Sequence, residues 1–517
     1  MKIYFILAWT LLLNIEVYAQ KESVTIRIDV NQESKQISPL IFGQFIEHLG
    51  RSIDGGIYDE SSPLSDKDGF RTDVMEKIIA LHPPILRYPG GTVVKIYHWQ
   101  DGIGPKSERP KRPNLIWGGI TDNHFGTAEF VKYCRAIGAE PFLVVNMATG
   151  TPEEASNWVE YCNGTQDTYY ANLRRAHGYK EPFNVKFWGI GNEEYAVPDA
   201  GKHQNVDKYI EDAWQYVKLM KLQSPSIKLT LVGNSEDLNW SRKVLKEMNH
   251  VIDYLSIHLY AMPVDANYSS MLQSVSNFNQ IIDSMRTLLA NTSEKVSDFP
   301  MWYRFPPRQE AVKLAIDEWG IWDMQSGKGR GTYNLEYPYD WSHALAVSQF
   351  LNIFCRNSDI IRVATWAQLV NVLAPIMTNA TGSYRQTVYT PLQAYRKYTE
   401  KSYLPVSVIS PSMDKNKNMI DAIASISDDK NKIVLTVLNL SPNVSLPLNL
   451  SFDHLTKGTH FTLRERITYS ATTLNEPNTF NKDVVIEKNE LFNTDSKSNS
   501  SVDLPPASLN FLIFNLK

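Results

Sequence analysis

Eight short apolar segments recur along the chain, mostly separated by segments with helical amphipathic periodicity. Their interiors are largely apolar at consecutive positions, which is typical of parallel strands buried on both faces. Eight strand-then-helix units across ~350 residues predict a (β/α)₈ barrel, because that fold accommodates insertions of this size. The predicted strands are Ile41–Phe45, Ile85–Arg87, Pro141–Val145, Val185–Gly191, Leu229–Gly233, Tyr254–His258, Leu314–Glu318 and Arg362–Trp366.

The amphipathic segments between these runs are predicted to be helices. A doubly wound open sheet would show the same alternation and is the alternative fold. The count of eight strands, and the lack of a Gly-x-Gly-x-x-Gly motif after the first strand, favour the barrel. The predicted helices are Thr72–Leu81, Ala128–Ile137, Val206–Leu222, Ser241–Met248, Asn277–Leu289 and His343–Phe354.

Residues 41–402 are thus expected to form the barrel, and residues 403–517 show a different pattern. Short strands divided by Asn, Ser, Asp and Pro turns predict a C-terminal β-sandwich domain. Residues 20–40 carry an alternating strand, Val24–Val30, that has no place in the barrel, and we expect it to pair with that sandwich. The predicted C-terminal strands are Ala422–Ile426, Lys432–Leu440, Ser445–Phe452, His460–Ile467, Val484–Ile486 and Ser508–Leu516.

Residues 1–19 have the pattern of a secretory signal peptide. Lys2 precedes an apolar run from Ile3 to Leu13, and the small residues Val17 and Ala19 take positions −3 and −1 of a cut after Ala19. The run is shorter than the ~20 residues that a spanning helix needs. We therefore expect cleavage and export to the periplasm or the medium, and no membrane span.

Charge and cysteine content narrow the possible partners. Lys and Arg number 52 and Asp and Glu 56, a net charge of −4 that offers no basic field for a nucleic acid. Cys134, Cys162 and Cys355 show neither a disulfide framework nor zinc-ligand spacing. We expect no nucleic-acid partner, no metal and no cofactor.

Glutamates stand at two of the predicted strand ends, where barrel enzymes carry their reactive groups. Glu193 follows the fourth strand and Glu318 ends the seventh. Glycosidic bond hydrolysis needs such a pair, because one carboxylic acid protonates the leaving oxygen while the other attacks the anomeric carbon or activates water. A single glutamate there would more often cap a helix or form a rim ion pair, but two at functional edges favour catalysis.

The chain resembles the α-L-arabinofuranosidases of glycoside hydrolase family 51, retaining (β/α)₈ glycosidases of clan A, over nearly all residues after the predicted signal. The resemblance implies an exo-acting enzyme that releases terminal α-L-arabinofuranosyl groups from arabinan, arabinoxylan or their oligosaccharides. Many relatives form homo-oligomers, so the resemblance implies a homo-oligomer here too. It is densest in Phe42–Arg51 with Gly55–Tyr58, Leu86–Gly91, Trp99–Pro105, Gly191–Glu193 with Asp317–Trp319, and Ala367–Val372.

The resemblance also implies roles for the residues at the strand ends. Glu193 matches the general acid/base and Glu318 the nucleophile, and their carboxyl groups are then expected ~5–5.5 Å apart. Asn192 matches the residue that hydrogen-bonds the sugar 2-hydroxyl, although Asn also favours helix N-caps.

Three further residues match sugar-site positions of the family, and two more lie beside them. Glu47 and Gln368 match residues that hold the furanose hydroxyls, and Tyr260 matches a tyrosine that hydrogen-bonds the nucleophile. His258 lies two residues earlier and on the same strand face, either as a sugar contact or as a support for other groups. Thr92 stands where well-studied relatives carry Asn, and its hydroxyl lacks the amide's paired groups, which leaves fine specificity open.

Trp99 and Trp322 are expected as pocket walls, the alternative being two tryptophans of the core. The connection from His258 to Glu318 is long, and Ser269–Pro307 is expected to form a loop insertion on the leaving-group side.

Three other functions are compatible with these residues. Another clan A glycosidase, a xylosidase or a β-glucanase, would use the same two glutamates. A non-catalytic glycan-binding barrel would not need both carboxylates. A metal-dependent hydrolase could use His258 and Asp317, but no His-x-His or His-Glu-x-x-His spacing supports it.

Overall fold

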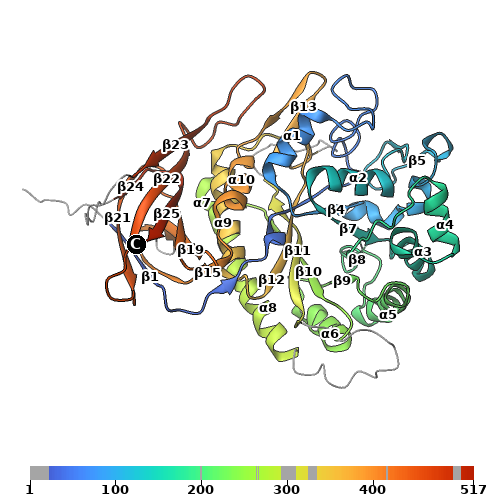
Figure 1. Ribbon diagram of the computed structural model, residues 1–517, viewed down its shortest axis with the longest axis horizontal. Helices are drawn as coiled ribbons and strands as arrows, with labels where there is room; N and C mark the ends of the chain where they lie inside the picture. Colours follow the sequence, from blue (N-terminus) through green and yellow to red (C-terminus); the bar gives the residue numbers. More distant parts are fainter. Residues whose placement is uncertain are drawn as a thin grey trace, which may run out of the picture.

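The computed structural model describes residues 23–197, 201–263, 265, 267–292, 310–323, 335–414, 417–492 and 502–517. Within these residues, eight parallel strands close into a barrel (Figure 1). The (β/α)₈ prediction is therefore confirmed, and closure excludes the doubly wound open sheet. In spatial order the strands are β10 (Tyr254–Ala261), β11 (Lys313–Ile321), β12 (Ile361–Ala367), β3 (Gly43–Phe45), β4 (Ile85–Tyr88), β7 (Glu140–Val145), β8 (Phe187–Ile190) and β9 (Lys228–Val232).

Helices cover the outside of the barrel (Figure 1). Their ends follow local chemistry: the Thr151 hydroxyl accepts from the backbone N–H of Glu154 at the start of α3, and Gly138 takes the left-handed conformation that ends α2. They are α1 (Thr72–Leu81), α2 (Thr127–Ile137), α3 (Pro152–Asn163), α4 (Tyr169–Ala176), α5 (Val206–Gln223), α6 (Leu238–Met248), α7 (Tyr268–Ser276), α8 (Phe278–Thr292), α9 (Trp341–Arg356) and α10 (Tyr389–Tyr398).

The expected loop insertion at 269–307 is wrong for residues 269–292, whereas the helix predicted within it at Asn277–Leu289 is confirmed. These residues belong to α7 and α8, whose apolar side chains, such as Met271 and Ile282, are buried in the core. Burying an apolar face stabilises helices in a connection that sequence length alone suggests is a loop. Residues 293–307 lie outside the described residues.

The connection from β4 to α2 consists of short elements around the barrel mouth. Sequence periodicity does not detect segments of two to five residues. The connection contains the 3₁₀ segments η2 (Thr92–Ile96), η3 (Trp99–Gly102) and η4 (Lys106–Glu108) and the hairpin β5 (Arg112–Pro113) with β6 (Ile120–Thr121). Elsewhere lie η1 (Pro39–Phe42) and the hairpins β13 (Ile376–Asn379) with β14 (Gly382–Arg385) and β17 (Ser412–Asp414) with β18 (Lys417–Asn418).

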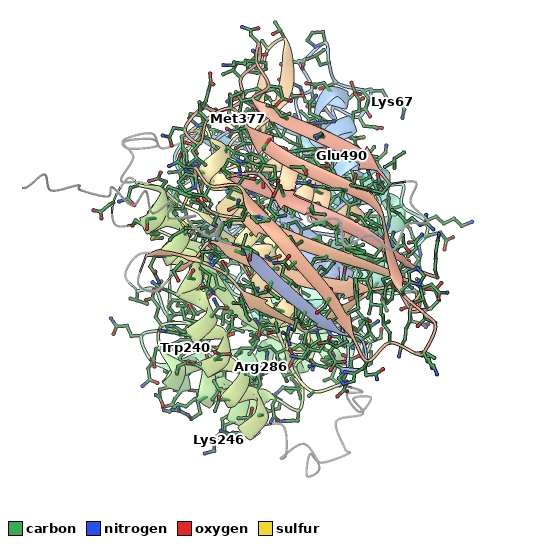
Figure 2. The ribbon with its side chains drawn as sticks, turned by 90° about the vertical axis from the view of Figure 1, so that its left-hand side faces the viewer. Lys67, Trp240, Lys246, Arg286, Met377 and Glu490 are labelled. Carbon is green, nitrogen blue, oxygen red and sulfur yellow. The ribbon has the colours of Figure 1, made fainter. Side chains whose placement is uncertain are left out.

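Two further sheets of the described residues form the predicted C-terminal sandwich, and the N-terminal strand lies in it. Figure 2 shows the blue strand β1 among the orange-red strands. The smaller sheet has the order β16 (Val406–Ile409), β1 (Val24–Asp29), β21 (Leu446–Asp453), β24 (Val502–Leu504). The larger has the order β2 (Lys35–Gln36), β15 (Ser402–Leu404), β19 (Ile420–Ile426), β20 (Lys432–Asn439), β25 (Ser508–Leu516), β22 (Phe461–Ala471), β23 (Val485–Leu491).

The middle strands β20 and β25 of the larger sheet are buried on both faces. On one face Leu435 and Leu512 share a core with Ile26 of β1. On the other, Phe511 packs against the Tyr395 ring of α10, with ring centroids 5.4 Å apart. Figure 1 places α9 and α10 between this sheet and the barrel strands, which explains why α9 is buried along almost its whole length.

Candidate active site

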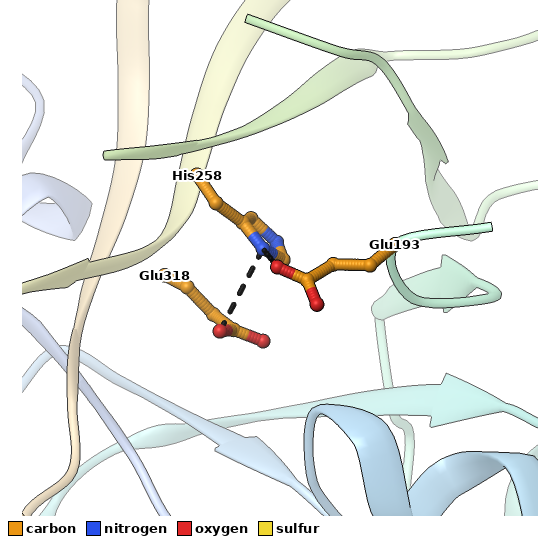
Figure 3. Close-up of side chains that lie close together, drawn as sticks. All are labelled: Glu193, His258 and Glu318. Carbon is orange, nitrogen blue, oxygen red and sulfur yellow. Dashed lines mark hydrogen bonds and ion pairs between the residues drawn. The ribbon is translucent and has the colours of Figure 1, made fainter. Parts of the chain in front are cut away.

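The proposed glutamate pair lies at the carboxyl ends of β8 and β11. Glu193 follows β8 in a turn, and Glu318 belongs to β11 (Figure 3). One carboxylate oxygen of Glu193 lies within 4.8 Å of one of Glu318. This spacing fits the ~5–5.5 Å between carboxyl groups in retaining glycosidases and not the ~6.5–9.5 Å of inverting enzymes. The Glu193 side chain is 25% exposed and that of Glu318 is 9% exposed, so the first is the more accessible to a leaving group.

Buried Arg87 on β4 joins the two strand ends. Its Nη1 donates to Glu318 Oε1 at 2.7 Å, and its Nη2 donates to Asn192 Oδ1 at 2.8 Å. Burial works against its charge, but the carboxylates of Asp317 and Glu318 outweigh burial and raise the pKa of Arg87. The sequence indicates Arg87 only as part of a family motif, although an arginine inside a buried apolar strand is itself a signal of a charged partner.

Asn192 presents a free amide group at the mouth. Its oxygen is occupied by Arg87, whereas its Nδ2 is buried and has no hydrogen-bond partner among the described residues. The helix-cap interpretation is wrong, because turns follow Asn192 and the next helix, α5, is capped by Asn205. The Nδ2 group is therefore available to donate to a ligand.

His258 on β10 contacts three carboxylates. Its Nδ1 lies 2.8 Å from Glu193 Oε1 and 3.6 Å from Glu318 Oε2 (Figure 3). Its Nε2 lies 3.6 Å from Asp317 Oδ1. Burial disfavours the charged ring, but the charge of Glu318 and the contacts with Asp317 and Glu193 raise the pKa of His258 to about 10.

The contact with His258 lowers the pKa of Glu193. Burial alone would raise the pKa of Glu193, but the hydrogen bond and charge of His258, with the charges of Arg87 and Lys95, hold that pKa below its usual value. In the unliganded site the proton of the pair therefore resides on His258.

Glu47 and Gln368 are hydrogen-bonded to each other on another side of the barrel mouth. Glu47 Oε1 accepts from the backbone N–H of Val93 at 3.0 Å and from Trp117 Nε1 at 2.9 Å, and its Oε2 accepts from Gln368 Nε2 at 2.7 Å. Burial, with the nearby charge of Glu318, raises the pKa of Glu47. Trp117 lies in the β5–β6 hairpin, and the sequence analysis missed it because nothing in this irregular connection marks one aromatic residue over another.

The remaining site residues surround the nucleophile position. The Tyr260 hydroxyl donates to Glu318 Oε2 at 2.9 Å, and Trp322 stands edge-on to Tyr260 with ring centroids 6.0 Å apart. Thr92 opens η2 directly after Gly91. A Cβ at position 91 would lie 2.7 Å from Glu318 Oε1, so only glycine leaves room for that carboxylate.

The prediction that Trp99 forms a pocket wall is wrong. Trp99 is 1% exposed, stacks on Trp158 with ring centroids 6.1 Å apart, and donates from Nε1 to the carbonyl of Glu154 at 3.0 Å. It begins η3 and packs against α3 because a large apolar ring gains most by full burial. Trp117 takes the place beside Glu47 instead.

Comparisons with known proteins identify the family of the chain. The chain matches the families described as "Alpha-L-arabinofuranosidase 1 domain" over residues 77–281 and "Alpha-L-arabinofuranosidase C-terminal domain" over residues 317–508. It is 40% identical over 392 residues to α-L-arabinofuranosidase C of Emericella nidulans, covering 74% of this chain and 75% of that protein. The chain belongs to the α-L-arabinofuranosidases of glycoside hydrolase family 51.

Two other α-L-arabinofuranosidases show the extent of the likeness. The Bacillus subtilis "intracellular exo-alpha-(1->5)-L-arabinofuranosidase 1" is 32% identical over 432 residues, 80% of this chain and 84% of that protein. The thermostable GH51 α-L-arabinofuranosidase structure from Thermotoga petrophila is 36% identical, with a TM-score of 0.84, over 95% of this chain and 100% of that one. The chain is thus an arabinofuranosidase-type glycoside hydrolase.

The expected export is corrected by these comparisons. The Bacillus subtilis arabinofuranosidase is named as intracellular, which contradicts the expected export. The expectation came from the composition of residues 1–19 alone, which lie outside the described residues. In the described part of the chain, no helix has both the length and the apolarity needed to cross a membrane.

Glu193, His258 and Glu318 are also close enough together to ligate one metal ion. A histidine ligand must be neutral, and because the pKa of His258 is raised to about 10, an ion bound there would have to displace its proton.

Proposed function

We propose that the chain releases terminal α-L-arabinofuranosyl groups by double displacement, with Glu318 as nucleophile and Glu193 as general acid/base. The observation that carries the proposal is the short spacing of the two carboxylates at the barrel mouth, within 4.8 Å. No water fits between nucleophile and sugar at such a spacing, so the carboxylate itself attacks.

The first step forms an arabinosyl-enzyme. Arg87 and Tyr260 each donate to one oxygen of Glu318 and so orient it for attack on the anomeric carbon. The bond to the leaving oxygen breaks, and that oxygen takes a proton from Glu193. His258, 2.8 Å from Glu193, supplies the proton that this carboxylate lacks in the unliganded site.

The second step hydrolyses that intermediate. Glu193 accepts a proton from water, the water oxygen attacks the anomeric carbon, and the ester bond to Glu318 breaks. Glu193 then returns the proton to His258, which restores the unliganded site. Two displacements at one carbon leave its configuration as it was in the substrate.

Sugar recognition follows from the polar groups around the pair. Asn192 Nδ2 is the free donor for the 2-hydroxyl, and Glu47 with Gln368 would exchange part of their mutual hydrogen bonding for furanose hydroxyls. Thr92 and Trp322 complete the wall in this proposal. The substrate is an arabinose-containing plant polysaccharide or oligosaccharide. The family resemblance also implies a homo-oligomer, which light scattering on the purified chain tests.

A substrate panel tests the activity. Aryl α-L-arabinofuranoside, aryl β-D-xyloside and cellooligosaccharides are compared with arabinan and arabinoxylan oligosaccharides, and products are identified by chromatography. We expect arabinose to be the sole sugar released. Turnover of the xyloside or cellooligosaccharide without the arabinofuranoside would favour a different clan A glycosidase. Sugar binding with no turnover would point to a glycan-binding barrel.

A further inference from the structure

Glu194, the residue after the proposed acid/base, carries a buried charge that the reaction does not use. Its side chain is 0% exposed. It accepts hydrogen bonds from Lys95 Nζ, from His203 Nδ1 at 2.9 Å and from the backbone N–H of Asn192 at 3.3 Å. Burial opposes ionisation, but His203 and Lys95 outweigh it and hold the pKa of Glu194 below its usual value.

The contacts of Glu194 hold a turn with an uncommon backbone. Gly191 has φ 76° and Glu193 has φ 42°, both in the left-handed region. A side chain at position 191 would lie 2.6 Å from Glu194 Oε1, so the turn closes tightly around that carboxylate. A non-glycine residue keeps such a φ only where its surroundings hold it. The hydrogen bond from Asn192 to Glu194 is one such restraint.

His203 extends the contact toward α5. Its backbone N–H donates to the Glu194 carbonyl at 2.8 Å, and its Nε2 lies 3.0 Å from Asp212 Oδ2 on α5. His203 thus binds both the main chain and the side chain of Glu194. Asp212 is 45% exposed, so this end of the network reaches solvent.

Lys95 extends the contact to the other wall of the mouth. It lies on η2, whose Val93 N–H holds Glu47, and its own carbonyl accepts from Thr149 Oγ1 at 2.8 Å. The segment η2 therefore contacts Glu47 through Val93 and, through Lys95, contacts Glu194 in the turn that carries Glu193.

We propose that Lys95, Glu194 and His203 form a buried charge network that positions the acid/base, by fixing the Asn192–Glu193 turn so that Glu193 faces the leaving oxygen. The proposal rests on the proposed role of Glu193. None of the three touches the reacting atoms, so they are positioning residues.

Stability alone is a weak reason for such a network. A buried ion pair loses hydration on both sides, and apolar side chains of similar volume often serve folding equally well. What an apolar pair cannot supply is an acceptor for the Asn192 N–H. Lys95 also contributes a positive charge that acts on Glu193.

A leaving-group series separates positioning from stability. Glu194→Gln and Lys95→Met are compared with wild type on 2,4-dinitrophenyl and on unsubstituted phenyl α-L-arabinofuranoside. Dinitrophenolate departs without a proton, whereas phenolate needs one. Misdirected Glu193 is therefore expected to lower kcat/KM for the phenyl substrate ~10- to 100-fold, and for the dinitrophenyl substrate by much less. Lys95→Arg keeps the charge and is expected to keep the wild-type ratio of the two values.

Two controls keep the outcomes distinct. Glu129→Gln breaks a buried pair with Arg109, 2.9 Å away, outside the site, and should lower Tm without changing the substrate ratio. The double variant Lys95→Met with Glu194→Met removes both charges, and it should recover Tm but not the ratio if either single variant folds poorly. An unchanged ratio in Glu194→Gln and in the double variant would overturn the network. An unchanged ratio in Glu193→Ala would instead overturn the proposed function.

Discussion

At the scale of single residues, the site works through buried charges that are shared among several partners. Arg87 binds the proposed nucleophile and Asn192 together, and His258 faces Glu193, Glu318 and Asp317. Sharing one cation allows these carboxylates to lie close together, and in the unliganded site His258 holds the proton that Glu193 later delivers.

Trp117→Phe removes the indole N–H that donates to Glu47 at 2.9 Å. We expect about a tenfold loss of kcat/KM on an aryl arabinofuranoside, because a lost hydrogen bond to a buried carboxylate costs about 1–3 kcal/mol. The matched control is Trp99→Phe, which should lower Tm and leave kcat/KM near wild type. A larger kinetic loss in Trp99→Phe would contradict this placement of the two tryptophans.

The raised pKa of His258 predicts how stability depends on pH. The folded state favours the imidazolium, so its stabilising contribution is complete below about pH 6.5 and is lost as the pH rises towards about 10. The free energy of unfolding should fall across this window by at most about 1.4 kcal/mol per pH unit for one proton. Denaturant titrations at several pH values measure it, and His258→Asn should flatten the fall. Equal slopes in the two proteins would refute the charged histidine.

The sequence was most informative where residue type and strand position agree. Glu193 and Glu318 stand at strand ends, and Tyr260 lies on the strand face of His258, so a barrel prediction already places them at the mouth. Trp117 could not be found this way, because its position depends on how a long irregular connection folds back onto Glu47. The pocket-wall prediction for Trp99 failed for the same reason, because a motif gives the position of a residue along the chain but not where its side chain packs.

At the scale of elements, the connection from β4 to α2 forms much of the mouth. Its glycines let the backbone approach the side chains of Glu47 and Glu318 closely. A Cβ at Gly90 would lie 2.5 Å from Glu47 Cγ, and one at Gly91 would lie 2.7 Å from Glu318 Oε1. Its 3₁₀ segment η2 then provides the N–H that holds Glu47.

Gly91→Ala should therefore displace the nucleophile. A displacement of about 1 Å costs about 100-fold in rate, so we expect kcat to fall by that order while Tm changes little. Gly382→Ala is the matched control, because nothing lies within 4 Å of a Cβ built there. Kinetic measurements on the pair check this, and wild-type kcat in Gly91→Ala would contradict the close approach.

Long periodic elements were predictable and short ones were not. Each predicted barrel strand and helix has an observed counterpart, with ends shifted by a few residues, because period and burial agree along it. The 3₁₀ segments and two-residue strands are too short to show a period. Helix α3 did carry a start signal, Thr151 followed by Pro152 and Glu154, that would have identified it.

At the scale of the whole molecule, the two ends of the chain meet in one sandwich. β1 pairs antiparallel with β16 and parallel with β21, and the larger sheet also packs on barrel helices. The lone alternating pattern of β1 showed that it needed a partner outside the barrel. Its exact register could not be read from sequence, since register depends on which strands it meets.

Ile26→Ala tests the placement of β1 in the sandwich, because Ile26 is fully buried between the two sheets. We expect a loss of about 2–4 kcal/mol in the free energy of unfolding, from lost burial and the remaining cavity. Arg27→Ala on the exposed face of the same strand should change it by no more than about 0.5 kcal/mol. Chemical denaturation compares them, and equal effects would contradict the placement of β1.

The stereochemistry of azide products tests the central claim, that Glu318 is the nucleophile and Glu193 the acid/base, most directly. Each glutamate is replaced by Ala and incubated with azide and an activated aryl α-L-arabinofuranoside, and the arabinosyl azide is assigned by NMR. We predict the inverted β-azide from Glu318→Ala, because azide replaces the missing nucleophile. Glu193→Ala should give the retained α-azide, because azide then attacks the arabinosyl-enzyme. The opposite assignment, or wild-type turnover in Glu318→Ala without azide, would contradict the account.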